Sequence, residues 1–237
     1  MNTPFVEQLR TGKVKKLGDK HAQNPMERQW ETGMFKNERE GQVWLTKTGL
    51  KEDEVADTKV HGGPEKALFA YPVHHYEYWL NDLPVDDIGA GAMGENLVLT
   101  GADEFTTFIG DTYQYGEAVI QVSQPRQPCW KPARRFKVLD FALRIQRSGR
   151  TGWYYRVIEE GYVEAGVTLE LIDRPYSQWS VAAANEVMHE KKDDLRLTYD
   201  LNNCELLAPN WKRTLSRRLQ GRESSVEKRV YGENVDE

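Results

Sequence analysis

Cys129 is the residue of this chain with the clearest capacity for chemistry. It lies in residues 124–131 (QPRQPCWK), where prolines, Arg126 and Lys131 surround it. The thiolate, rather than the thiol, is the nucleophile and the metal ligand, and neighbouring cations lower the pKa of a cysteine. Because proline fixes φ and removes a backbone donor, we expect this segment to be a stiff loop rather than a helix interior or a central strand. The other cysteine, Cys204, has no such surroundings and is expected to be structural.

A second segment could bind an anion. Residues 57–67 (DTKVHGGPEKA) form a Gly-Gly-Pro turn that carries His61 and Lys66. The glycines permit positive φ angles and close approach of the backbone to a ligand, and the lysine adds a compact positive charge suited to phosphate. Residues 91–97 (GAMGENL) are again rich in glycine, and Asn96 in this segment can donate and accept hydrogen bonds.

Six short motifs follow one another in a fixed order: residues 59–64 (KVHGGP), 71–72 (YP), 75–76 (HY), 94–97 (GENL), 109–111 (IGD) and 124–129 (QPRQPC). As a set they resemble the MOSC domain, a family named for the C-terminal domain of molybdenum cofactor sulfurase. The resemblance runs from about Leu45 to Leu171. From Trp179 onward the chain is similar to a short three-helix extension of one bacterial subgroup of stand-alone MOSC proteins, which is associated with detoxifying N-hydroxylated base analogues.

The resemblance implies a molybdenum-pterin cofactor with Cys129 as its protein ligand, and reduction of N-hydroxylated compounds by oxo transfer. A cofactor of this kind carries the hard chemistry, while the protein supplies position and charge. The candidates for the pterin phosphate and pyran edge are Lys66, Arg126, Arg150 and Arg156, with His61 and Asn96 orienting the group.

Electrons for such a reaction would come from outside the chain. The sequence has neither a cysteine set for an iron–sulfur cluster nor a glycine fingerprint for a flavin or a nicotinamide. We therefore expect an external reductase or a ferredoxin-like partner.

Two other classes of function remain open. In the first, Cys129 carries sulfur as a persulfide, which is the role suggested by the family's name. In the second, the chain is a non-catalytic carrier that holds the cofactor for another enzyme.

The composition agrees with a soluble enzyme. The chain has 237 residues, of which 39% are hydrophobic, so it can bury a sizeable core. No apolar stretch approaches the roughly 20 residues of a membrane span, and the N-terminus lacks the pattern of a signal peptide, so we expect a cytoplasmic protein. Two cysteines make no disulfide framework, and the net charge of −5 argues against a non-specific nucleic-acid binder.

Short stretches rich in β-branched residues and bounded by turns predict a mainly β fold, a MOSC-like β-barrel with a few short helices. The clearest strands are expected at residues 5–10, 42–46, 118–122 and 166–171, and a helix at residues 73–80. The acidic residues 51–57 are expected to form a solvated loop without a metal.

The last third of the chain changes character. Capping residues and apolar residues at helical spacing predict helices over residues 181–188, 195–199 and 211–219, with Trp211, Leu215 and Leu219 forming one apolar stripe. We therefore divide the chain into a barrel domain at residues 1–175, a three-helix extension at 176–221 and a polar, flexible tail at 222–237.

Overall fold

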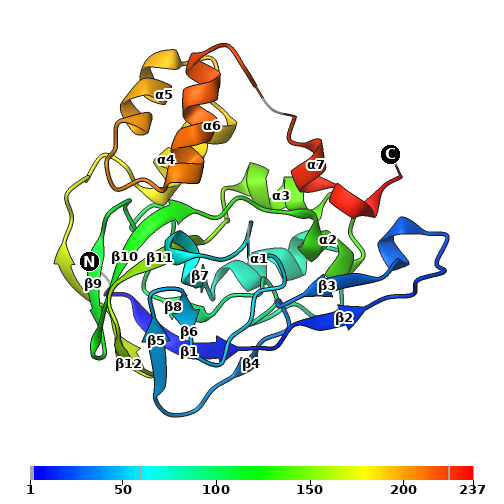
Figure 1. The fold of residues 1–237 in the computed structure, drawn as a ribbon, viewed down its shortest axis with the longest axis horizontal. Helices are drawn as coiled ribbons and strands as arrows, with labels where there is room; N and C mark the ends of the chain where they lie inside the picture. Colours follow the sequence, from blue (N-terminus) through cyan, green and yellow to red (C-terminus); the bar gives the residue numbers. More distant parts are fainter. Residues whose placement is uncertain (1–2, 59, 224, 237) are drawn as a thin grey trace.

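A curled sheet forms most of the molecule (Figure 1). The computed structural model describes residues 3–58, 60–223 and 225–236. Neighbouring strands of the main sheet are antiparallel except β7 and β8, which are parallel. In spatial order the strands are β13 (Val167–Thr168), β1 (Phe5–Thr11), β8 (Leu97–Thr100), β7 (Leu68–Pro72), β11 (Trp153–Glu159), β10 (Ala118–Pro125), β9 (Thr112–Tyr115) and β14 (Glu170–Asp173), and β4 (Asn37–Glu38) also pairs with β1.

Two smaller sheets extend this body. They consist of β5 (Val43–Thr46), β6 (Gly49–Leu50) and β12 (Gly161–Val163), and of β2 (Lys15–Leu17) with β3 (Trp30–Thr32). The side chains of Ile120 and Val122 on β10 are fully buried, as expected for β-branched residues on the core face of a strand. The expectation of a mainly β, barrel-like fold is confirmed.

Three helices interrupt the strands: α1 (His75–Asp82), α2 (Trp130–Phe136) and α3 (Phe141–Ser148). The first was expected from the sequence, and the other two were not. We expected a stiff loop over residues 124–131. The loop covers only residues 126–129, because β10 continues to Pro125 and α2 begins at Trp130. Pro132 fits inside α2 because the first turn of a helix does not need its backbone N–H groups.

The described residues also contain 3-10 helices at Pro25–Glu27, Pro64–Lys66 and Gly232–Asn234. No helix in the described residues is long and apolar enough to cross a membrane.

The C-terminal helices are α4 (Val181–His189), α5 (Leu195–Asn202) and α6 (Pro209–Leu219). Ser180 and Asp194 cap the first two, since their side-chain oxygens accept hydrogen bonds from Ala183 N at 3.0 Å and Leu197 N at 2.9 Å. Trp211 and Leu215 on α6 are fully buried in the same apolar cluster as strands β10 and β11. The division of the chain at residues 175 and 221 stays a prediction.

The tail contains regular structure in its described residues, and its flexibility stays a prediction. Residues 227–230 form a further helix, α7 (Glu227–Val230), and Val230 is fully buried. Figure 1 shows α7 and the C-terminus beside α2 and α3, away from the other C-terminal helices. Side chains of this segment form hydrogen bonds to α2 and to the loop before it.

Candidate active site

Cys129 lies between the end of β10 and the start of α2. Its backbone is extended, with φ −114° and ψ 174°, and its side chain is half-buried. The preceding chain is fixed to β11 by a hydrogen bond from Arg126 N to the Gly152 carbonyl at 3.0 Å. The Sγ atom of Cys129 lies 3.3 Å from Nε2 of His61, a residue 68 positions earlier. The fold therefore joins the two motifs that the sequence analysis singled out.

The surroundings of Cys129 favour its thiolate. Burial raises the pKa of the thiol, but the charges of His61 and Arg126, the hydrogen bond from His61 and the backbone N–H of Lys131 outweigh it and lower the pKa to about 6. At neutral pH the side chain is therefore mostly ionised, and it can act as a soft metal ligand or as a nucleophile.

The turn that presents His61 is shaped by glycine. Gly63 has φ +89°, a conformation that other residues rarely adopt, and it begins the 3-10 helix Pro64–Lys66. Within the turn, His61 N donates to the Asp57 carbonyl at 2.8 Å. Lys59, which belongs to the motif of this turn, lies outside the described residues.

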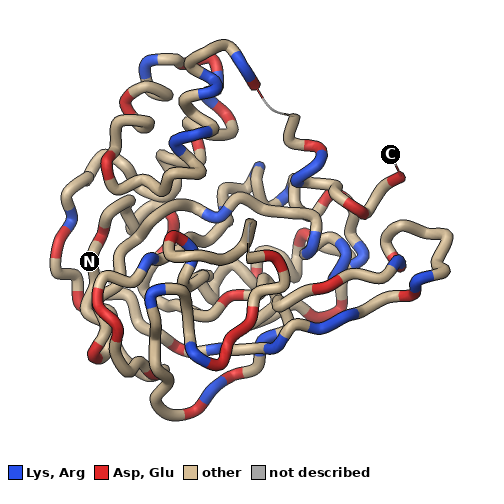
Figure 2. Tube along the Cα trace, viewed as in Figure 1, with Lys and Arg blue, Asp and Glu red and all other residues tan. Residues whose placement is uncertain are grey.

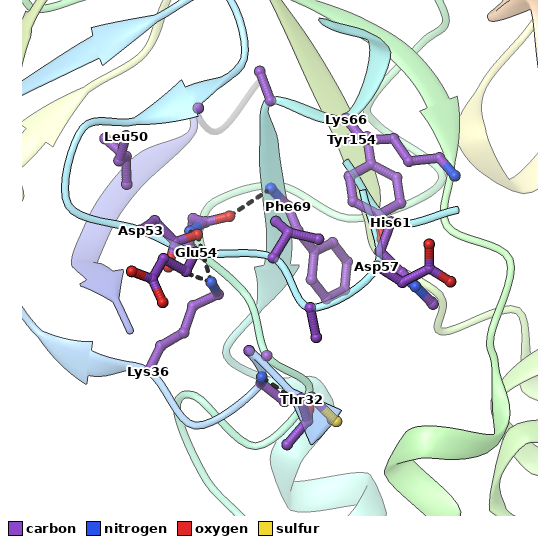
Figure 3. Close-up of a pocket in the computed structure, with 18 of the residues that line it drawn as sticks. Thr32, Lys36, Leu50, Asp53, Glu54, Asp57, His61, Lys66, Phe69 and Tyr154 are labelled. Carbon is purple, nitrogen blue, oxygen red and sulfur yellow. Dashed lines mark hydrogen bonds and ion pairs between the residues drawn. The ribbon is translucent and has the colours of Figure 1, made fainter. Parts of the chain in front are cut away.

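A cavity of about 360 Å³ opens beside Cys129. Its lining contains two aromatic rings and more basic than acidic side chains. The rings are Phe69 and Tyr154, the basic residues are Lys36, Lys51, Lys66, Arg126 and Lys131, and the acidic residues are Asp53, Glu54 and Asp57. Figure 3 shows Lys36 and Asp53 on one side of the cavity, His61, Lys66 and Tyr154 on the other, and Phe69 between them. Positive charge around aromatic surfaces suits a flat ligand with an anionic group.

Arg126 gives the cavity a buried cation with an unpaired donor. Its side chain is 5% exposed, and its guanidinium lies 5.1 Å from the centre of the Phe69 ring. The Nη1 atom is buried and has no hydrogen-bond partner in the described part of the chain. An unpaired buried donor costs about 1–3 kcal/mol, so an anionic ligand at this atom would remove a penalty that the protein alone leaves.

Lys66 lines the same cavity. Its Nζ atom donates to the Val60 carbonyl and lies 5.7 Å from the centre of the Tyr154 ring. Burial lowers the pKa of Lys66, while Cys129 and Asp57 act in the opposite direction. A half-buried ammonium next to the thiolate is suited to bind a further anion.

Asn96 lines the cavity and is hydrogen-bonded through both its oxygen and its nitrogen. Its side-chain oxygen accepts from Phe69 N at 3.1 Å, and its amide nitrogen donates to the Arg10 carbonyl at 3.2 Å and to Asp53 Oδ2 at 2.8 Å. These bonds use its donors, so Asn96 shapes the cavity wall through its neighbours.

The expectation that residues 51–57 form a solvated loop is wrong for Asp53. Its carboxylate is buried, 9% exposed, and is paired with Lys36 at 2.5 Å. The sequence offered little signal for this, because Lys36 is 17 positions away in a different segment. Lys36 and Asp53 are therefore cavity residues that the sequence analysis missed.

Arg150 and Arg156 lie outside the cavity beside Cys129. The guanidinium of Arg150 lies 3.8 Å from the centre of the Tyr78 ring, and Arg156 is bound to Glu65 at 2.5 Å and to Gln121 at 2.7 Å. Neither residue lines the cavity beside Cys129. The structure thus brings Cys129, His61, Lys66, Asn96 and Arg126 together and leaves these two arginines out.

Two family models match the chain. Residues 57–170 match the MOSC domain, and residues 179–222 match the YiiM-like, 3-alpha helix domain. Over 196 residues the chain is 40% identical to Protein YiiM of Escherichia coli strain K12, a match that covers 81% of this chain and 87% of that protein. The chain is a MOSC-domain protein of the YiiM-like group. The resemblance inferred from the motifs is confirmed.

Two further comparisons concern fold and activity. The crystal structure of YiiM from Escherichia coli superposes on this MOSC-domain protein with a TM-score of 0.76 and 32% identity, covering 94% of this chain and 100% of that one. A protein of Gibberella moniliformis named "Reductase" is 36% identical over 195 residues, which are 80% of this chain and 33% of that protein. The similarity to the YiiM crystal structure agrees with the curled sheet and the C-terminal helices described above.

Within the described residues, no group of three or more His, Cys, Asp or Glu side chains is arranged to hold a metal ion. The donor that the cavity does offer is a single soft thiolate.

Proposed function

We propose that this protein binds a molybdenum-pterin cofactor through Cys129 and reduces N-hydroxylated compounds. The observation that carries the proposal is the ionised thiol of Cys129 at the edge of a basic cavity in which Arg126 has an unpaired donor. The name of the fungal relative, "Reductase", supports an oxidoreductase. Membership of the MOSC family supports the choice of cofactor.

The residues present fit such a group. A cavity of about 360 Å³ is within the usual size range of small-molecule sites, roughly 300–1,000 Å³. Arg126 and Lys66 would bind the phosphate, and Phe69 and Tyr154 offer flat surfaces for the ring system. A thiolate suits molybdenum better than a carboxylate would, because soft ligands prefer soft metals.

The reaction is a two-electron reduction. The N–O bond of the substrate breaks, two electrons and two protons are taken up, and an amine and water are released. When bound, the cofactor would supply the redox chemistry. The protein would supply Cys129 as a thiolate, and His61, at 3.3 Å from Sγ, would orient it through their hydrogen bond. The electrons would come from an external reductase or a ferredoxin-like protein.

One alternative is favoured by a specific observation. The His61–Cys129 pair, with a thiol pKa of about 6, also suits a sulfur carrier, because a thiolate is needed to form and transfer a persulfide. A sulfur carrier would have a modified Cys129 and no stoichiometric molybdenum.

The other alternative is a cofactor carrier without activity of its own. It would retain molybdenum but would not turn over substrate.

The test is elemental analysis combined with turnover. The full chain is produced in a host that makes the molybdenum cofactor, and molybdenum per chain is measured after gel filtration. Reduction of a hydroxylaminopurine is then followed with a reduced viologen dye as electron donor. About one molybdenum per chain together with turnover supports the proposal. A persulfide on Cys129 without molybdenum identifies the sulfur carrier, and molybdenum without turnover identifies the cofactor carrier.

A further inference from the structure

The outer face of α6 carries a strong local positive charge. The chain as a whole has 32 Lys and Arg residues against 37 Asp and Glu residues, a net charge of −5. Residues 209–222 (PNWKRTLSRRLQGR) contain no Asp or Glu, and their basic residues are Lys212, Arg213, Arg217, Arg218 and Arg222. Figure 2 shows Lys and Arg along the helix that Figure 1 labels α6. An acidic chain thus presents a basic helix.

The charge of Arg218 has a structural use. This side chain is 7% exposed, and its guanidinium donates to the carbonyls of Val187 and Met188 at 2.7 Å each. Its Nε atom lies 3.3 Å from the carboxylate of Glu223. Arg218 therefore belongs to the packing of α6 against α4 and is separate from the exposed charge.

The other four cations are not neutralised within the described part of the chain. The side chain of Lys212 donates to a backbone carbonyl at 3.2 Å, and that of Arg222 donates to Gln220. Arg213 and Arg217 are exposed, and their side chains form no hydrogen bond or ion pair with a described residue. All four charges are therefore available to an external partner.

The stability of α6 does not account for this pattern. Cations in the last turn of a helix interact favourably with its dipole, which explains Arg217. Lys212 and Arg213 lie in the first half of the helix, where the dipole gives no such benefit. In addition, Arg213 and Arg217 are four positions apart, a spacing at which like charges repel each other on a helix. A partner of opposite charge would relieve this repulsion.

A shallow depression of about 420 Å³ follows the same face. The four cations line it together with Pro209, Ser216 and Gln220, and its lining has no acidic residue. All of these residues belong to one helix and the short segment after it, so the depression is an open surface. Small-molecule sites bury most of their ligand, so an open surface of this kind suits a macromolecule better.

The basic face begins next to the turn that carries His61. Ala208, the residue before α6, donates from its backbone N to the carbonyl of Ser123 on β10 at 2.9 Å. The hydroxyl of Ser123 donates in turn to the carbonyl of Glu65 at 2.6 Å. Glu65 belongs to the 3-10 helix of that turn, so the start of α6 is fixed beside one wall of the cavity.

The other end of the face also leads toward the cavity beside Cys129. Arg222 lines a second pocket, of about 210 Å³, whose wall includes Arg229 and Gln127. Gln127 lines the cavity beside Cys129 as well. The acidic residue of the second pocket, Glu223, is already paired with an arginine at 3.3 Å. Positive charge therefore continues from α6 to the edge of the cavity.

We propose that the face of α6 formed by Lys212, Arg213, Arg217 and Arg222 is the docking surface for an acidic electron-transfer protein. The inference rests on the proposed function, in which an external protein supplies the electrons. A one-electron carrier would be oxidised at each of two encounters and would so provide the two electrons that cleavage of the N–O bond requires.

Charge explains why such a partner would dock at this face. The net charge of −5 repels an acidic protein from the rest of the surface, whereas the basic face attracts it and orients it toward the cavity. Electron-transfer complexes have small, weak interfaces, in which complementary charge mainly governs the encounter and its orientation. The same net charge disfavours nucleic acid, a much larger polyanion.

The test measures binding of the full chain to two acidic carriers, a plant-type [2Fe–2S] ferredoxin and a flavodoxin, by isothermal titration calorimetry. The wild type should bind at least one of them at low salt. The double variant Arg213→Glu, Arg217→Glu should bind that carrier about tenfold more weakly. The difference should disappear at about 0.5 M salt, because exposed charges are then screened. No binding of either carrier by the wild type, or equal binding by the double variant, would overturn the proposal.

The matched control is the double variant Lys20→Glu, Arg196→Glu, which changes the net charge by the same amount. Both residues are exposed, and neither forms an ion pair with a described residue. The control should bind the carrier within about twofold of the wild type. An equal loss in the control would mean that the overall charge, rather than α6, governs binding. If the charge-reversed variant does not fold, Arg213→Gln, Arg217→Gln replaces it, with an expected loss of about threefold.

Two further measurements separate the alternatives. A short DNA duplex that binds more tightly than either carrier, and loses its binding in the same double variant, would make this face a nucleic-acid site and overturn the proposal. In carrier-driven turnover the double variant should raise the KM for the carrier and leave kcat unchanged, and an unchanged KM would refute a role in electron delivery. Binding is measured without molybdenum, so a chain without metal or turnover would count against the proposed function and leave the docking result intact.

Discussion

Cys129 and Cys204 lie in loops of similar kind and have opposite chemistry. Cys129 lies between β10 and α2, and burial acts to raise the pKa of its thiol. Cys204 lies between α5 and α6, is 2% exposed, and burial likewise raises its pKa. For Cys129 the result is nevertheless a pKa of about 6, whereas the pKa of Cys204 stays above its ordinary value.

The difference comes from the neighbours rather than from burial. Cys129 is approached by His61 and by Arg126, two groups that favour the ionised form. Lys212 and Arg156 act on Cys204 in the same direction but are outweighed by burial. The pKa of a cysteine in this protein is therefore lowered where neighbouring charges and hydrogen bonds outweigh burial, and raised where burial outweighs them.

The largest expected effect is that of replacing the thiol. Cys129→Ser should lower both molybdenum content and turnover by at least about a hundredfold, because the serine hydroxyl is not ionised at neutral pH and is a poor ligand for a soft metal. The fold should persist, since the side chain is half-buried in a loop. The measurements are metal content per chain, turnover and circular dichroism.

Cys204→Ser is the control for this substitution. It should leave turnover per folded molecule unchanged, although the loss of a buried thiol from the core will cost some stability. A comparable loss of turnover in Cys204→Ser, or full activity in Cys129→Ser, would reverse the comparison between the two cysteines.

Replacing His61 should make Cys129 behave more like an ordinary thiol. In His61→Asn the charge and the hydrogen bond at Sγ are lost, so the pKa of Cys129 should rise from about 6. A rise of one to two units lowers the thiolate fraction at pH ~6 by about ten- to a hundredfold. The ultraviolet absorbance of the thiolate against pH measures this directly. An unchanged midpoint would mean that Arg126 and the backbone N–H of Lys131 alone account for the depressed pKa.

The next-largest expected effect concerns the binding of the cofactor's phosphate group. Arg126→Gln and Lys66→Gln should each weaken cofactor retention by roughly ten- to a hundredfold, the equivalent of one charge-assisted hydrogen bond of about 1.5–3 kcal/mol. Lys66→Arg should also weaken cofactor retention, because the planar guanidinium of arginine does not replace the compact ammonium of lysine. The measurement is molybdenum per chain after gel filtration at several salt concentrations.

Arg150→Gln is the control for these variants, because Arg150 stacks on Tyr78 outside the cavity. It should retain the wild-type metal content. If molybdenum per chain is unchanged in both Arg126→Gln and Lys66→Gln but falls in Arg150→Gln, the phosphate is bound outside this cavity, by Arg150 or Arg156.

The smallest effect is on stability. The pKa of Cys129 is lower in the folded than in the unfolded chain, so its ionisation stabilises the fold fully above the unfolded pKa of about 8.5. This contribution, on the order of 2 kcal/mol after allowing for partial exposure, is lost as pH falls from about 8.5 to about 6. The difference in free energy of unfolding between wild type and Cys129→Ala should therefore grow as pH rises through this range. A difference that does not vary with pH would contradict a depressed pKa in the folded state.

Local features of the sequence were sufficient for several elements. Ser180 and Asp194 predicted the starts of α4 and α5. The spacing of Trp211 and Leu215 predicted the buried face of α6, although Leu219, the third residue of the expected stripe, is only half-buried. The motifs around His61 and Cys129 were sufficient to recognise the family. These predictions succeeded because capping, helical periodicity and turn chemistry depend on residues within a few positions of one another.

Contacts between distant segments could be decided only by the tertiary structure. The pairing of Lys36 with Asp53 buries a carboxylate from a segment that looked solvated, and the packing of Arg156 against Glu65 removes an arginine that looked suited to phosphate. The position of Arg229, 101 residues along the chain from the Pro128 carbonyl that it binds, left no local signature at all. A charged side chain can be solvated, paired or aimed at a ligand in any sequence context, and only the groups that the fold brings within a few ångströms decide among these outcomes.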